Sequence, residues 1–250
     1  MIIKGKTALI TGGAIRIGRA ITLGLAQAGA NVAINYYRDA ELAAQTATEA
    51  QALSVSATAV QADISDWEQV QRMFAQIHET LGPVDILVNN SSVFKKTPIP
   101  TDTVEDWQRV TGVLINGAFY TSNLAAVDML AKKQGAIINI VDLTAWEAWP
   151  KFAAHVVGKS ALLALTRQLA IDLAPYVRAN AIAPGPILPP LDYSPEKIKR
   201  TAAKTLLNTW GTPEDISKAV NFLIESDYIN ADVITVDGGE RYGHRKLEAG

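Results

Sequence analysis

A glycine-rich turn that joins a largely apolar run to a helical pattern is the feature that most constrains the fold of this 250-residue chain. Residues 7–10 form the run, and the sequence Thr-Gly-Gly-Ala-Ile-Arg-Ile-Gly follows at positions 11–18. Glycine lets a backbone reverse close to a bound group, and the free N–H groups at a helix start attract anions. The turn therefore predicts a phosphate-binding site. The alternative is that its glycines serve only the tight packing of a strand against a helix.

Strand-like and helix-like segments alternate along the whole chain, without a linker or a repeat of fixed period. Alternation of this kind is typical of a parallel sheet with helices on both faces. We expect one α/β domain over residues 1–250, with a doubly wound sheet of seven parallel strands. The predicted strands are residues 7–11, 31–35, 55–61, 85–88, 136–141, 178–183 and 232–236.

The helices are predicted from apolar residues at three- and four-residue spacing. The first follows the glycine turn, the last begins at Pro213, and the others are residues 39–52, 65–81, 103–110, 114–132 and 152–173. Ser65 and Glu68 have the spacing of a capping box at the start of the helix 65–81. The polar pair Thr111-Gly112 predicts a break between 103–110 and 114–132.

Two segments near the end of the sequence are not assigned to regular structure. Residues 188–208 begin with prolines and continue as a lysine-rich amphipathic stretch, which predicts a mobile cover over the substrate. Residues 240–250 are too polar to place. The substrate itself cannot be named from the loops 94–100 and 188–208.

Composition excludes several classes of protein. Cysteine is absent, which excludes disulfides and thiolate chemistry, and the three histidines lack metal-ligand spacing, so we expect no metal. The formal net charge of −2 gives no basis for a nucleic-acid or membrane partner. The apolar run 136–141 is too short to cross a bilayer, and the first six residues do not resemble a signal peptide. We therefore expect a cytoplasmic protein.

Polar residues follow the predicted strands at the places where a nucleotide-binding α/β sheet presents its ligands. With the glycine turn, they resemble the short-chain dehydrogenase/reductase family over nearly the whole chain: Asp63, Asn89-Asn90, Asn116, Asp142, Lys159 and Pro184-Gly185. The resemblance implies a Rossmann-type fold, a nicotinamide cofactor and a small-molecule substrate. The cofactor-binding residues that it implies are Gly12, Arg16, Ile17, Gly18, Tyr37, Arg38, Asp63, Ile64, Asn90, Ser91, Lys159, Pro184, Gly185 and Ile187.

The end of the second predicted strand indicates which cofactor binds. An NAD site usually has a carboxylate there, whereas this chain has Asn35 and Tyr36, followed by Arg38. Arg16 supplies a second cation, and guanidinium groups bind phosphate well. We therefore expect NADP(H), and the alternatives are that Arg38 caps a helix and that Arg16 is solvated. The resemblance implies that Asp63 meets the adenine amino group, with a role at the start of a helix as the alternative.

Three features narrow the resemblance to the pteridine reductases. Arg16 stands where most members of the family carry glycine, and Asp142 stands where they carry the catalytic serine. The segment Leu-Val-Asn-Asn-Ser-Ser-Val-Phe at positions 87–94 is also similar to that subgroup. The implied reaction is hydride transfer from NADPH to a C=N or C=O group.

The family's Tyr-x-x-x-Lys motif appears here with histidine in place of tyrosine, at His155 and Lys159. Asp142 precedes His155 by thirteen residues, which is the interval that the family keeps. Residues four apart share a helix face, so His155 and Lys159 should point together toward the nicotinamide. The pKa of an unperturbed imidazole is about 6.5. The charge of Lys159 favours the neutral form of His155, and the charge of Asp142 favours the protonated form. The pair Asp142–His155 is predicted to donate a proton, and the alternative is that the chain has lost its donor.

Further roles come from the resemblance alone. Lys159 would bind the ribose hydroxyls, and Asn116 would position a helix carbonyl and a water in a proton relay. By composition they are a surface lysine and a mid-helix polar residue. Phe94, Trp146 and Trp149 are predicted to line a pocket for a flat substrate, and ordinary core packing is the alternative.

Three functions remain open at this point. The first is an NADPH-dependent, pteridine reductase-like enzyme. The second is a 3-oxoacyl-(acyl-carrier-protein) or general ketone reductase. The third is an NADP(H)-binding sensor or scaffold with weak or absent catalysis.

The helix 152–173 is apolar on more than one face and needs a second partner, and the resemblance implies a homotetramer.

Overall fold

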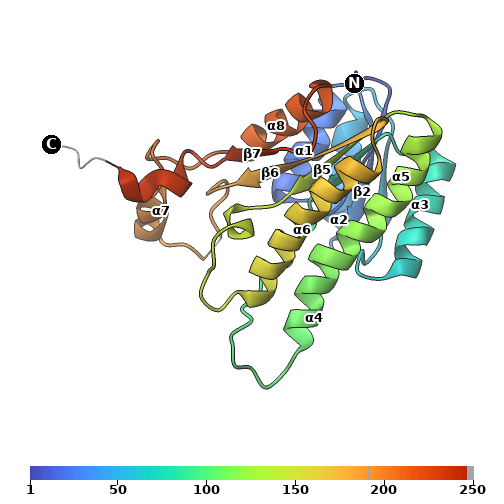
Figure 1. Ribbon diagram of the computed structural model, residues 1–250. Helices are drawn as coiled ribbons and strands as arrows, with labels where there is room; N and C mark the ends of the chain where they lie inside the picture. Colours follow the sequence, from blue (N-terminus) through green and yellow to red (C-terminus); the bar gives the residue numbers. More distant parts are fainter. Residues whose placement is uncertain (191, 247–250) are drawn as a thin grey trace.

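The computed structural model describes residues 1–190 and 192–246, and its centre is a sheet of seven parallel strands (Figure 1). The strand order is β3-β2-β1-β4-β5-β6-β7, so the winding reverses direction between β1 and β4. This is the predicted doubly wound Rossmann-type sheet. The strands are β1 (Thr7–Ile10), β2 (Asn31–Tyr36), β3 (Ala57–Gln61), β4 (Ile86–Asn89), β5 (Gly135–Ile140), β6 (Val177–Pro184) and β7 (Val233–Val236).

Helices cover both faces of the sheet. They are α1 (Arg16–Gln27), α2 (Ala40–Gln51), α3 (Trp67–Leu81), α4 (Glu105–Thr111), α5 (Ala118–Ala131), α6 (Ala153–Asp172), α7 (Pro195–Ala202) and α8 (Pro213–Glu225). Figure 1 shows α3, α5 and α6 side by side on one face, and α1, α2 and α8 pack on the other. Short 3-10 helices occur at Leu143–Ala145 and Glu240–Arg245.

The buried strands explain why the sequence predicts them as short apolar runs. In β1, Ala8 and Ile10 belong to the core under α1 and α8, and Leu9 belongs to the core under α3 and α5. Successive side chains of a strand point to opposite faces, so a strand covered on both sides is apolar throughout.

The predicted break at Thr111-Gly112 is wrong. The chain continues from α4 through a π-helical turn, Gly112–Gly117, into α5. Gly117 is needed here because a Cβ atom would lie 2.7 Å from the side chain of Ile64. The continuous helix of residues 105–131 is long and apolar enough to cross a membrane, but half of its most apolar window is buried against the rest of the protein, as in a core helix.

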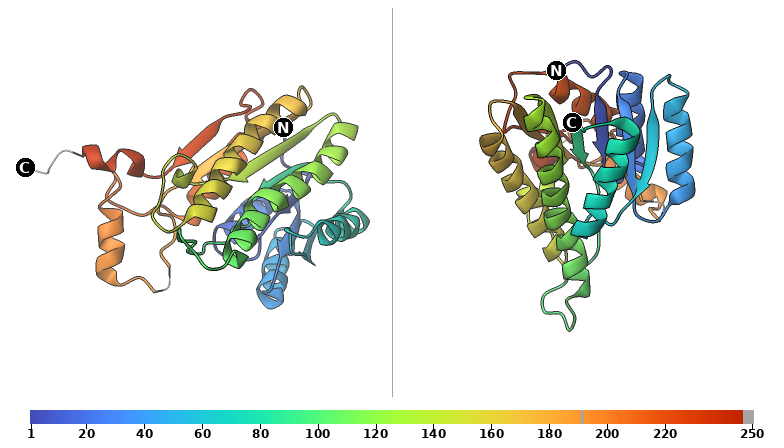
Figure 2. Two further views of the ribbon diagram at one scale, coloured as in Figure 1. Left: turned by 60° about the horizontal axis from the view of Figure 1, so that its bottom comes forward. Right: turned by 90° about the vertical axis from the view of Figure 1, so that its right-hand side faces the viewer.

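Two local predictions also change. The N-cap of α3 is Asp66, whose side chain accepts from the backbone N–H of Gln69, so the predicted capping box at Ser65 and Glu68 is wrong. The predicted cover contains α7, which begins after the N-cap Ser194. In Figure 2, α7 and the 3-10 helix at residues 240–245 lie together beyond one end of the main layers. Residues 191 and 247–250 lie outside the described residues.

Candidate active site

A cleft of about 670 Å³ opens at the carboxyl ends of the strands, where the winding reverses. A switch point of this kind is the usual ligand site of an open α/β sheet. The predicted residues that line it are Gly12, Arg16, Ile17, Gly18, Tyr37, Arg38, Asp63, Ile64, Asn90, Ser91, Phe94, Asp142, Trp149, His155, Lys159, Pro184, Gly185 and Ile187. The fold therefore gathers into one cleft residues that the sequence spreads over most of the chain.

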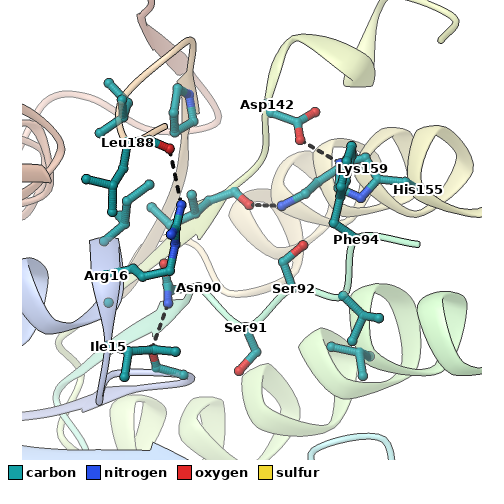
Figure 3. Close-up of a pocket in the computed structure, with 18 of the residues that line it drawn as sticks. Ile15, Arg16, Asn90, Ser91, Ser92, Phe94, Asp142, His155, Lys159 and Leu188 are labelled. Carbon is teal, nitrogen blue, oxygen red and sulfur yellow. Dashed lines mark hydrogen bonds and ion pairs between the residues drawn. The ribbon is translucent and has the colours of Figure 1, made fainter. Parts of the chain in front are cut away.

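The glycine turn is held tightly against strand β4. Gly12 has a φ of +60°, and a Cβ atom on Gly18 would lie 2.0 Å from the carbonyl oxygen of Gly12. The side-chain amide of Asn90, labelled in Figure 3, donates to the carbonyl of Thr11 at 3.0 Å and to that of Gly12 at 3.1 Å. Both glycines are therefore required by the turn itself.

The start of α1 is suited to an anion. Its N-cap is Ile15, which has no side-chain oxygen to accept from the first backbone N–H groups, and its first turn contains no carboxylate. Such N–H groups carry partial positive charge toward a ligand. Arg16, at a φ of +52°, donates from Nη2 to the carbonyl of Leu188 at 3.1 Å, which joins the glycine turn to the segment 188–208 (Figure 3).

Asn35, at the end of β2, is occupied by the backbone around it. It is 2% exposed, its Oδ1 accepts from the N–H of Gly12 at 3.4 Å, and its Nδ2 donates to the carbonyl of Ala62 at 3.1 Å. The exposed side chains that line the cleft directly after the end of β2 are therefore those of Tyr37 and Arg38.

Asp63 lies in a cluster of polar side chains. Its Oδ1 accepts from the N–H and the hydroxyl of Ser65, at 3.0 and 2.7 Å, and its Oδ2 lies 2.5 Å from Nη1 of Arg109. Burial alone would raise the pKa of Asp63, but the Ser65 hydrogen bonds and the Arg109 guanidinium outweigh burial and lower it. Asp63 is thus a carboxylate that is already paired. Arg109, which was not predicted from the sequence, lines the same cleft.

Asp142 and His155 form a hydrogen-bonded pair at the opposite end of the cleft. Nε2 of His155 lies 2.7 Å from Oδ2 of Asp142, and the backbone N–H of Thr144 donates to Oδ1 at 2.9 Å (Figure 3). Burial would raise the pKa of Asp142, but the His155 hydrogen bond and the charge of Lys159 lower it on balance. His155 is 3% exposed, and its Nδ1 has no hydrogen-bond partner among the described residues.

Lys159 lies one helical turn beyond His155. Its Nζ donates to the carbonyl of Ile140, at the end of β5, at 2.7 Å (Figure 3). The side chain is 3% exposed, and burial lowers its pKa, although the charge of Asp142 works in the opposite direction. Lys159 is therefore a buried side chain and not the surface lysine that composition alone suggests.

Aromatic side chains stand beside this group. The ring of Phe94 meets the ring of His155 edge-on, with centroids 4.8 Å apart, and stacks on Phe152 at 4.4 Å. Trp149 lies edge-on to Phe94 at 6.5 Å and also lines the cleft. Two aromatic side chains that were not predicted from the sequence, Tyr193 and Trp210, also line the cleft.

Two predicted site residues lie elsewhere. Asn116 is exposed on the π-helical turn and is not among the residues that line the cleft, so its place in a proton relay stays a prediction from the resemblance. The side chain that this helix packs toward α6 is Leu114, which a Cβ atom on Gly158 would meet at 2.6 Å. Trp146 is 52% exposed and also lies outside the cleft lining.

Comparison with known proteins shows similarity across the chain. Residues 13–240 match the model of a family described as enoyl-(acyl carrier protein) reductase. The chain is 34% identical to 3beta-hydroxysteroid dehydrogenase 1 of Eggerthella lenta, over 95% of this chain and 94% of that protein. It is 32% identical to the 3-oxoacyl-(acyl-carrier-protein) reductase FabG of Staphylococcus aureus, over 94% of this chain and 97% of that protein.

A solved structure has the same fold. The crystal structure of a blue fluorescent protein from a metagenomic library, in complex with NADPH, matches with a TM-score of 0.88 at 34% identity. The match covers 96% of this chain and 99% of that chain.

Proposed function

Because the chain belongs to the short-chain dehydrogenase/reductase family of NAD(P)-dependent oxidoreductases, we propose that it is an NADPH-dependent reductase acting on a C=N or C=O group of a flat ring, as pteridine reductases do. The observation that carries this proposal is the Asp142–His155 pair beside Lys159 in the cleft. The rings of Phe94 and Trp149 at the same end of the cleft support a planar substrate.

The cleft fits a dinucleotide with a 2′-phosphate. The N–H groups at the start of α1 suit the pyrophosphate, and the cations Arg16 and Arg38 suit the additional phosphate. The neutral residues Asn35 and Tyr36 end β2, where a carboxylate would repel that phosphate. When bound, NADPH supplies the hydride. Backbone groups of Pro184 to Ile187 would hold the carboxamide at the other end of the cleft.

His155 would act as the proton donor in place of a tyrosine. Asp142 holds Nε2, so Nδ1 is the nitrogen that remains for exchange with the substrate. In the reduction, the Nδ1–H of an imidazolium gives its proton to the substrate nitrogen or oxygen that has gained the electron pair. Asp142 stays ionised because its pKa is lowered, and its negative charge stabilises the imidazolium before transfer.

Lys159 would act as a donor to ribose hydroxyls and not as the acid. Its Nζ is fixed by the carbonyl of Ile140, so its position relative to His155 is set by the fold. Because burial lowers the pKa of Lys159, its ammonium gives up a proton more readily than an exposed lysine, which reduces its opposition to a charged His155.

A second candidate is the reduction of a 3-oxoacyl group or another ketone. The similarity to 3-oxoacyl-(acyl-carrier-protein) reductases and to a hydroxysteroid dehydrogenase favours it. The same His155 would protonate the ketone oxygen. A sensor or scaffold that binds NADP(H) without turnover is the third candidate.

For each candidate, we propose that the protein is a cytoplasmic homo-oligomer, and the family resemblance suggests a tetramer.

The test is NADPH oxidation from pH 5 to 9 with a dihydropterin, folate and simple ketones, using wild type, His155→Phe and His155→Tyr. We expect wild-type turnover with the pterin, a fall in rate as pH rises past the titration of one group, and a loss of about a hundredfold or more in the Phe variant. Preference for ketones would favour the second candidate. Turnover in the Tyr variant alone, with a silent wild type that still binds NADPH, would favour the sensor.

A further inference from the structure

Arg109 on α4 lies at the end of the cleft that is lined by the residues following β2 and β3. It is far along the chain from the glycine turn. Its guanidinium lies 2.5 Å from Asp63 and 3.0 Å from the Ser65 hydroxyl, both through Nη1. Its side chain is 29% exposed, so it is partly open to a ligand. Charge-assisted contacts of this kind hold an arginine in one orientation.

The ring of Tyr37 joins Arg109 to Arg38. The guanidinium carbon of Arg38 lies 5.0 Å from the ring centroid, and that of Arg109 lies 4.7 Å from the same centroid. Cations at these distances are attracted to the ring. Two guanidinium groups from different elements are therefore held beside one aromatic ring that lines the cleft.

The pairing also changes the local charge. Without Arg109, the negative charge of Asp63 would cancel the positive charge of Arg38. A carboxylate at this end of the cleft would also repel a phosphate dianion. With Arg109 paired to it, the three side chains carry a net positive charge. The lowered pKa of Asp63 fits a carboxylate that stays ionised in this cluster.

We propose that Arg109 is a specificity-determining residue, which together with Arg38 recognises the 2′-phosphate of NADP(H). This inference rests on the proposed function, because it requires a dinucleotide in the cleft. It differs from the sequence-based assignment, which gives this task to Arg16 and Arg38 alone. It also gives Asp63 a different role, that of holding Arg109.

The experiment measures binding and not turnover. NADPH and NADH are titrated by fluorescence, and adenosine 2′,5′-bisphosphate and ADP by calorimetry, against wild type, Arg109→Gln and Arg109→Lys. The matched control is Arg72→Gln, which removes an exposed arginine of α3 that pairs only with Glu68 among the described residues. We expect Arg109→Gln to weaken both 2′-phosphate ligands at least about tenfold and the other two less than about threefold. Arg109→Lys should keep most of the preference, and Arg72→Gln all of it.

The outcomes separate this inference from the proposed function. An Arg109→Gln variant that weakens all four ligands equally, or none, overturns the role of Arg109. So does a Lys variant with no more preference than the Gln variant. A wild type that binds NADH as tightly as NADPH instead overturns the choice of cofactor on which the inference rests.

Discussion

Asp142 illustrates how one side chain supports both the site and the fold. It accepts from His155 through one oxygen and from Thr144 through the other. Its pKa lies below the ordinary value of 3.8, so the unfolded chain takes up this proton first as the pH falls. The stabilising contribution is therefore complete above about pH 5 and is lost as the pH falls through the folded-state pKa.

We expect Asp142→Asn to lower the free energy of unfolding by about 1–3 kcal/mol at pH 7, because a buried charged hydrogen bond is lost. The difference from wild type should shrink toward pH 3. Urea unfolding at both pH values measures it. Asp102→Asn, in an exposed loop, is the control and should match wild type at both. A difference that stays constant with pH would contradict the assignment of this carboxylate.

Single residues also show how much of the site could be predicted from the sequence alone. Asp142, His155 and Lys159 were predicted together because their spacing resembles the family's motif, and because residues four apart, such as His155 and Lys159, share one helix face. Arg109 could not be predicted in this way, since its partner Asp63 belongs to another element and the contact depends on how α4 packs. Trp149 lines the cleft, whereas Trp146, which directly follows the 3-10 helix Leu143–Ala145, does not.

At the scale of elements, a π-helical turn joins α4 to α5, and Asn116 is an exposed residue of this turn. A π-turn adds a residue to the helical repeat and rotates the side chains that follow. The role of Asn116 came from the family resemblance alone, and no residue pattern predicted which side of this turn it occupies. Gly112, which with Thr111 suggested a break, instead lies close to Ser65, and Gly117 lies close to Ile64.

Gly117→Ala should disturb the cleft through this contact. The added methyl group would lie 2.7 Å from Ile64, which lines the cleft, so the side chain must move. We expect a loss of about 1–3 kcal/mol in unfolding free energy and weaker NADPH binding. Thermal melting and a fluorescence titration measure both. Gly112→Ala is the matched control, because its Cβ atom meets Ser65 at a milder 3.3 Å and alanine favours helix. Equal effects of the two changes would refute the steric argument.

At the scale of the whole molecule, strands were easier to predict than the covering segment. Strands buried on both faces are continuous apolar runs, and their order follows from right-handed crossovers. The position of α7 depends instead on single contacts, such as the Trp210 indole donating to the carbonyl of Ile198 at 3.0 Å. Contacts of that kind leave no periodic pattern in a sequence.

Exposed apolar side chains on α5 and α6 support the expected oligomer. Val127 is 63% exposed, Val157 is 44% exposed and Ile171 is 71% exposed. We expect light scattering after gel filtration to give a multiple of the chain mass, and Val157→Glu to reduce it, because burying an unpaired carboxylate is costly. Leu42→Glu, at a similarly exposed position on the opposite face in α2, should leave the mass unchanged. A monomeric wild type would exclude the oligomer.

The strand order also has a consequence for synthesis. The ribosome makes β1 early, yet β1 lies between β2 and β4, and the cleft lining extends from Gly12 to Glu240. A nascent chain thus exposes the glycine turn long before β6 and β7 exist to complete the opposite wall. The complete cleft therefore exists only after the last crossover is made, and until then the growing chain relies on its own apolar strands.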